Sequence, residues 1–156
     1  MKKQYMMMLA VATAVVALPA STLAVELYTG GKSEADIRAD SVVRCHNESG
    51  EFGAEAIEIC VQAESAARAA LAQYPDEVSD IVIRCNTQLY MAGWTRIKYC
   101  ADNDIRARES LSAYPQQQAE LIAQCRKDVG GDGDARVKQC VDERSSQRDK
   151  NEPKPK

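Results

Sequence analysis

The six cysteines of this 156-residue chain are regularly spaced. They form three pairs whose members lie fifteen positions apart, and corresponding members recur every forty positions: Cys45 and Cys60, Cys85 and Cys100, Cys125 and Cys140. Glycines recur with the same period, at Gly53, Gly93 and Gly133. The dipeptide Tyr74-Pro75 likewise recurs as Tyr114-Pro115. A self-similar period of this length predicts stacked units that cannot bury their apolar faces alone.

Each forty-residue unit has the pattern of two helices. In the second unit, Pro75 suits the first position of a helix that ends near Leu89, and its apolar stripe is Val78, Ile81, Val82, Cys85 and Leu89. A second helix follows the shared glycine and should close at Tyr114, because the residue before a proline avoids the helical region. The sequence therefore predicts an all-α fold of three tandem disulfide-stapled αα-hairpins, forming a short solenoid-like or bundled helical domain. We place the repeats at about 35–74, 75–114 and 115–150.

The spacing also predicts which cysteines pair. In an antiparallel hairpin, residues equidistant from the turn lie opposite each other, and the midpoint of Cys45 and Cys60 falls in the turn at 49–53. Between units, Cys60 lies further from the turn at Tyr74-Pro75 than Cys85 does, by about four residues or roughly 6 Å along a helix. That offset suits disulfide geometry poorly. We therefore predict three bonds within hairpins, 45–60, 85–100 and 125–140.

The first residues of the chain have the pattern of a secretory signal peptide. Lys2 and Lys3 precede an apolar stretch, and Ala24 ends a small-residue cleavage site. We expect a signal peptide at 1–24, a flexible lead at 25–32, one helical domain at 33–150 capped at its start by Ser33, and a disordered tail at 151–156. No cysteine precedes Cys45, so no lipid anchor is indicated. We expect a periplasmic or secreted protein without stable membrane insertion.

Composition limits both the partners and the core. Removing Lys2 and Lys3 from 20 basic residues leaves 18 against 23 acidic ones, a net charge near -5, so nucleic acid is not an expected partner. Leu, Ile, Val and Phe make up fewer than a fifth of the residues after position 24, which is few for an unaided core. Closing a fifteen-residue loop with a disulfide offsets about 3 kcal/mol of this deficit per bond on the chain-entropy model.

No reaction is readable from the residues. A thioredoxin-like site needs Cys-x-x-Cys, a zinc site needs close ligand pairs, and only one histidine, His46, is present. Nucleophile-base pairs and phosphate-binding glycine loops are also missing from the sequence. We expect no cofactor, no catalytic residue and no enzymatic activity.

Two weaker patterns have plain structural alternatives. Asp128, Asp132 and Asp134 lie on a glycine-rich segment of calcium-like composition, but the segment fails the EF-hand spacing and is better explained as a tight acidic turn between helices. Glu64 with Arg68, and Asp104 with Arg108, are spaced for i,i+4 ion pairs on the second helices of two units.

The tips of the hairpins differ between units while the framework repeats. The second unit carries Tyr90, Met91 and Trp94, and the first carries Phe52. Such side chains are typical interface anchors, although Trp94 and Tyr90 would equally serve to close a sparse core. We therefore expect a non-enzymatic helical-repeat protein that binds an unidentified protein or peptide of the cell envelope. The alternative is a small periplasmic inhibitor or envelope-stress protein that occludes an enzyme; calcium binding by the 128–134 turn is a second alternative.

Overall fold

The computed structural model describes residues 27–151, which are helical almost throughout and contain no strand. Six α-helices follow one another: α1 (Glu34–Ser49), α2 (Ala54–Leu71), α3 (Ser79–Leu89), α4 (Trp94–Ser112), α5 (Ala119–Val129) and α6 (Asp134–Asn151). Four short 3-10 turns connect them: η1 (Gly50–Phe52), η2 (Asp76–Val78), η3 (Gln116–Gln118) and η4 (Gly130–Asp132). The predicted all-α fold of tandem helical hairpins is confirmed.

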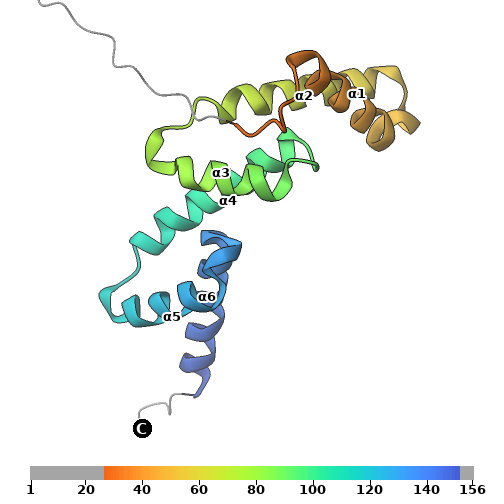
Figure 1. Ribbon diagram of the computed structural model, residues 1–156. Helices are drawn as coiled ribbons and strands as arrows, with labels where there is room; N and C mark the ends of the chain where they lie inside the picture. The colour runs from red at the N-terminus through yellow and green to blue at the C-terminus, as the bar shows by residue number, and fades with distance from the viewer. Residues whose placement is uncertain (1–26, 152–156) are drawn as a thin grey trace, which may run out of the picture.

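The helices form an elongated array rather than a closed bundle (Figure 1). Within each repeat the two helices pack as a hairpin, α1 with α2, α3 with α4 and α5 with α6. Between repeats the main contacts are made by the second helices, because α4 packs against α2 on one side and α6 on the other. The first hairpin therefore stands at one end of the array and the third at the other (Figure 1).

Each hairpin carries its own disulfide, and all three predicted pairings are confirmed. The Cα–Cα distances are 5.6 Å for Cys45–Cys60, 5.8 Å for Cys85–Cys100 and 5.9 Å for Cys125–Cys140. The first cysteine of every pair is fully buried. Covalent bonds of this kind place the folded protein in an oxidising compartment.

The apolar core lies largely between repeats. One buried cluster joins Leu71 of the first repeat to Ile81, Val82 and Ile97 of the second. A second joins Leu111 to residues of the third repeat, among them Leu121, Val137 and Val141. The last turns of α2 and α4 therefore each supply the leucine that holds the next hairpin in place.

Several helix boundaries differ from the predicted ones. The helix after Pro75 begins only at Ser79, because Pro75 is extended (φ -69°, ψ 155°) and a 3-10 turn intervenes. Helix α4 ends at Ser112 instead of Tyr114, where the chain tightens before the proline through bonds such as Tyr114 N–H to Leu111 O. At the start of the domain, Ser33 caps α1 as predicted, in a reciprocal capping box with Asp36.

The described part of the lead packs on the helices. Leu27 contacts the first core cluster, and the backbone oxygen of Tyr28 accepts a hydrogen bond of 3.2 Å from the Asn86 side chain. The predicted signal peptide at 1–24 and tail residues 152–156 lie outside the described residues, and Asn151 is the last residue of α6. None of the helices in residues 27–151 is both long and apolar enough to cross a membrane.

The central disulfide offers a test of how far covalent bonds hold this fold. We expect Cys85→Ala/Cys100→Ala to lower the free energy of unfolding by about 2–4 kcal/mol, because the bond closes a loop beside the first core cluster. Urea unfolding followed by circular dichroism measures the change. A loss below about 1 kcal/mol would show that noncovalent contacts between repeats hold the hairpin without the bond.

Candidate functional site

A buried carboxylate joins the first repeat to the second. Glu64 of α2 is 3% exposed and accepts hydrogen bonds from the backbone N–H groups of Trp94 (2.8 Å) and Thr95 (3.2 Å) at the start of α4. The Thr95 hydroxyl donates to it at 2.5 Å, and Arg44 of α1 forms an ion pair with it at 2.8 Å. Glu64 thus caps the amino terminus of a neighbouring helix, where partial positive charge gathers.

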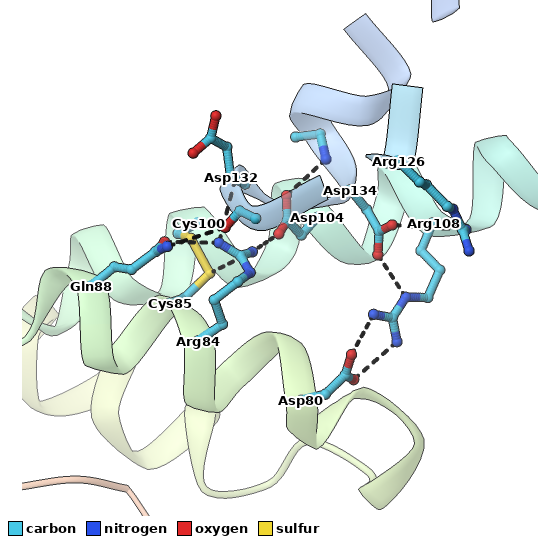
Figure 2. Close-up of polar contacts among 12 residues, drawn as sticks. Asp80, Arg84, Cys85, Gln88, Cys100, Asp104, Arg108, Arg126, Asp132 and Asp134 are labelled. Atoms are coloured by element: carbon cyan, nitrogen blue, oxygen red, sulfur yellow. Dashed lines mark hydrogen bonds and ion pairs between the residues drawn. A yellow bond between two sulfur atoms is a disulfide. The ribbon is translucent and has the colours of Figure 1, made fainter. Parts of the chain in front are cut away.

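The same arrangement recurs forty residues later (Figure 2). Asp104 of α4 forms an ion pair with Arg84 and accepts the Ala135 backbone N–H at 2.9 Å, at the start of α6. We call this repeated unit of arginine, buried acid and capped helix the junction clasp. Charged groups surround the second clasp, since Arg108 bridges Asp134 (2.8 Å) and Asp80 (2.6 Å).

The shared glycines are needed where the clasps form. Gly93 (φ 103°) and Gly133 (φ 105°) adopt a conformation that only glycine accepts readily. A Cβ on Gly93 would also lie 2.6 Å from Arg44 Nε and 2.9 Å from the Glu64 carboxylate, and one on Gly133 would collide with Asp104 and Arg84. Gly53 has the same backbone shape, yet a Cβ there would meet nothing within 4 Å.

The predicted i,i+4 ion pairs are wrong. Glu64 pairs with Arg44, while Arg68 pairs with Glu34 and lies 5.4 Å from the centre of the Trp94 ring. The exchange recurs in the second repeat, where Asp104 pairs with Arg84, and Arg108 with Asp80 and Asp134. The helices turn the acids toward the next repeat, which spacing along one helix does not reveal. The recurrence of Arg44 and Arg84, each directly before a cysteine, was the available signal.

A second repeated contact involves the Tyr-Pro connections. The Tyr74 hydroxyl donates to Asp102, which also pairs with Lys98 at 2.7 Å. Forty residues on, Tyr114, Asp142 and Lys138 form the same set. Burial raises the pKa of the Tyr74 hydroxyl, and its hydrogen bond to Asp102 raises it further. The set fixes the end of one repeat against the second helix of the next.

Each end repeat of the array lacks one half of a junction clasp at its outer side. Arg144 stands at the position of Glu64 and Asp104, so α6 cannot offer a carboxylate to a following helix. It pairs instead with Asp128 at 2.7 Å. At the other end, the first repeat has the open glycine Gly53, and an elongated groove of about 760 Å³ runs along α1 and α2. We call it the repeat-1 groove.

The acidic segment at 128–134 does not have the arrangement of a calcium site. Asp128 pairs with Arg144, and Asp134 pairs with Arg108, so arginines hold two of the three candidate carboxylates. The backbone oxygen of Asp132 accepts a 3.5 Å contact from Arg84. The described side chains contain no group of three or more His, Cys, Asp or Glu residues placed to hold a metal ion.

The candidate binding residues separate into exposed and buried ones. Tyr90 and Met91 are exposed, at 47% and 68%, and Phe52 is exposed on η1. Trp94 is only 8% exposed and belongs to the first core cluster, so its predicted role as a surface anchor is corrected to a mainly structural one. A hollow of about 30 Å³ still reaches Trp94 from between Tyr28 and Tyr90.

The hairpin tips lie along one edge of the array. Arg96, near the start of α4, pairs with Glu48 beside the first tip at 3.2 Å. Gln88, near the end of α3, donates to the backbone oxygen of Gly131 in the third tip at 3.4 Å. The ring of Tyr90 in the second tip makes an edge-to-face contact with the ring of Tyr28 in the lead, with ring centres 5.7 Å apart. We call Tyr28, Tyr90 and Met91 the tip patch.

No family model, curated protein or solved structure matches this chain.

The clasp can be tested by removing one charge. We expect Glu64→Gln to lower the free energy of unfolding by about 3–5 kcal/mol, because the partly buried Arg44 loses its charged partner. The matched control is Glu58→Gln, an exposed acid on the same helix, which should change the free energy by no more than about 0.5 kcal/mol. Urea unfolding of both variants measures the difference, and equal effects would reduce the clasp to a surface pair.

The clasp also predicts an acid-sensitive stability. Burial alone would raise the Glu64 pKa, but hydrogen bonds from Thr95, the two backbone N–H groups and the charge of Arg44 outweigh it and lower that pKa. A lowered folded-state pKa stabilises the protein above the unfolded value of about 4.3, and this stability is lost as pH falls. The free energy of unfolding of the wild type should therefore fall more steeply below about pH 4.3 than that of Glu64→Gln. The two slopes should differ by at most the binding of one proton on unfolding. Parallel slopes in urea titrations from pH 7 to 3 would contradict this.

Proposed function

We propose that this protein is a non-enzymatic binding module of the periplasm or extracellular space, and that its tip patch contacts a partner protein or peptide. The observation that carries the proposal is the grouping of Tyr28, Tyr90 and Met91 at one exposed edge, at 56%, 47% and 68% exposure. Large apolar side chains gathered on a surface are typical of protein interaction sites.

The composition of the chain strengthens this interpretation. Leu, Ile, Val and Phe are scarce in the sequence, and both core clusters leave the tip patch outside. A chain short of core residues gains nothing in folding from aromatic and methionine side chains left in water. Their exposure is therefore better explained by a partner that covers them.

The edge extends beyond the second repeat. Phe52, 72% exposed in η1, stands on the first tip, next to the region that the Arg96–Glu48 pair joins to α4. An extended ligand lying along the tips would meet Phe52 and then Tyr90 and Met91, with the acidic third tip beyond them. Repeat arrays commonly place recognition on such variable tips over a fixed framework.

The place of action follows from the chemistry of the framework. Three disulfides require an oxidising environment, and the amino-terminal sequence has the features of a secretory signal. Both support a protein that works in the periplasm or outside the cell. The partner would be a protein or peptide of the same compartment.

A photo-crosslinking residue at position 91 tests the proposal in the native envelope. Met91 suits this experiment because it is exposed, whereas Trp94 is buried. We expect a specific protein adduct from position 91 and none from position 106, an exposed control on α4, with mass spectrometry identifying the partner. The double substitution Tyr90→Ala/Tyr28→Ala should lower the yield of the adduct at least tenfold while helicity is retained. A tenfold loss corresponds to about 1.4 kcal/mol of binding free energy. An adduct of equal strength from both positions, or none from 91 in the folded protein, would contradict the proposal.

A further inference from the structure

The repeat-1 groove occupies a position that is filled in the other two repeats. Residues Arg38, Ser41, Val61, Gln62 and Ser65 line it. Forty residues on, the equivalent positions are Val78, Ile81, Ala101, Asp102 and Ile105. The comparison between these two sets shows what the groove is shaped to receive.

In the second repeat these positions surround the carboxyl-terminal end of the preceding helix. Ile81 and Ala101 are buried in the same cluster as Leu71, and Tyr74, Val78 and Ile105 pack against that cluster. Asp102 accepts the Tyr74 hydroxyl. In the third repeat, Leu111 and Tyr114 are received in the same way by Leu121, Val141 and Asp142. The first repeat has the receiving positions, but no helix precedes it within the described residues, which begin at residue 27.

The amino terminus of α2 is open in the same sense. At α4 and α6, a carboxylate from the preceding helix caps the first backbone N–H groups, and a Cβ on the preceding glycine would strike it. At α2, no described residue supplies that carboxylate, and the space beside Gly53 is empty to 4 Å. The open glycine and the groove are two separate parts of one receiving surface.

The occupants of the filled positions define the ligand. Helix α2 presents Glu64, then Leu71 seven residues later and Tyr74 ten residues later. Helix α4 presents Asp104, Leu111 and Tyr114 at the same intervals. The acid caps the receiving helix, the leucine enters the core, and the tyrosine hydroxyl reaches the side chain at position 102 or 142.

We propose that the repeat-1 groove binds the carboxyl-terminal half of an amphipathic helix from another protein, with an acid seven residues before a leucine and ten before a tyrosine. The ligand helix lies parallel to α2, its acid at the N–H groups of Ala54 and Glu55 and its leucine between α1 and α2. Its tyrosine hydroxyl donates to the amide oxygen of Gln62. The amide nitrogen of Gln62 already donates to Glu58 at 3.1 Å, so the oxygen is the atom left to accept. The site is separate from the tip patch and does not depend on it.

The lining of the groove indicates reversible binding. Ser41 and Ser65 stand where the second repeat has Ile81 and Ile105, so the empty groove is more easily hydrated and larger. A protein with this surface stays folded while the groove is open, as a terminal repeat must. An amphipathic helix entering such a groove is a common mode of peptide recognition.

A second copy of this chain does not fit the groove. Its α6 would present Arg144 to the amino terminus of α2, where positive charge is unfavourable. Asn151 and Lys154 stand at the leucine and tyrosine positions. The partner helix therefore comes from a different protein.

The chain supplies its own probe for the test. A synthetic peptide of residues 101–115 carries Asp104, Leu111 and Tyr114 and contains no cysteine. Because short helices are marginal in water, the peptide is held helical by a hydrocarbon staple between positions 102 and 106, on the side opposite Leu111. It is titrated into the full disulfide-bonded protein labelled with 15N, and amide shifts locate the site.

We expect shifts at Ala54, Val61 and Ser65, and at least tenfold weaker binding for the same peptide with Leu111→Ala and Tyr114→Ala. In the protein, Ser65→Arg should block binding, whereas Ala66→Arg, its exposed neighbour outside the groove, should leave the dissociation constant within twofold. Circular dichroism confirms that both variants fold. Shifts confined to other regions, equal binding of the two peptides, no binding at millimolar peptide, or self-association of the protein through the groove would overturn the proposal. A failed titration leaves the crosslink from position 91 unaffected, so the two proposals fail separately.

Discussion

The carboxylate buried between successive second helices is the interaction on which the array depends. Glu64 and Asp104 each leave water, a cost that is recovered only because an arginine and the free N–H groups of a helix terminus meet them together. A joint of this kind needs little apolar area, which suits a chain with so few Leu, Ile, Val and Phe residues. It also tolerates one geometry only, because the glycine beside it has no room for a side chain. Disulfides fix each hairpin internally, and the clasps fix one hairpin to the next.

The features that sequence predicts here are those determined by short-range spacing. The helical hairpins, the three disulfides and the Ser33 cap follow from intervals of a few to fifteen residues, and the repeat follows from a constant period of forty. The clasps could not be predicted in this way, since they require that α2 and α4 run side by side so that Glu64 reaches Trp94 thirty residues away. The burial of Trp94 was equally hidden, because it is covered by Arg68 from another helix and by the packed lead. Within the candidate sites, the sequence left open whether Tyr90 lies at the surface or closes the core, and the packing of the helices leaves it exposed while burying Trp94.

The two candidate binding surfaces differ in origin. The tip patch arises where repeats are allowed to differ, so it reflects residues added to a framework that does not need them. The repeat-1 groove arises where the framework itself is interrupted. Its chemistry corresponds to the contacts that the second and third repeats make with the helix before them. A surface of the first kind can change freely without affecting stability, whereas a change in the receiving positions of an internal repeat would also loosen the array.

The clasp has a direction, and this bears on how such a protein changes length. Only in the second repeat are both parts engaged, because Gly93 receives Glu64 and Asp104 reaches the next hairpin; among the described residues Gly53 of the first repeat receives no acid, and the third repeat has Arg144 at the donating position. A tandem duplication of the segment 75–114 would therefore join correctly to itself and to both neighbours, whereas a duplicated third repeat would present Arg144 to the amino terminus of the helix that follows. Such an array can therefore lengthen from its middle by whole forty-residue steps, with both end repeats unchanged.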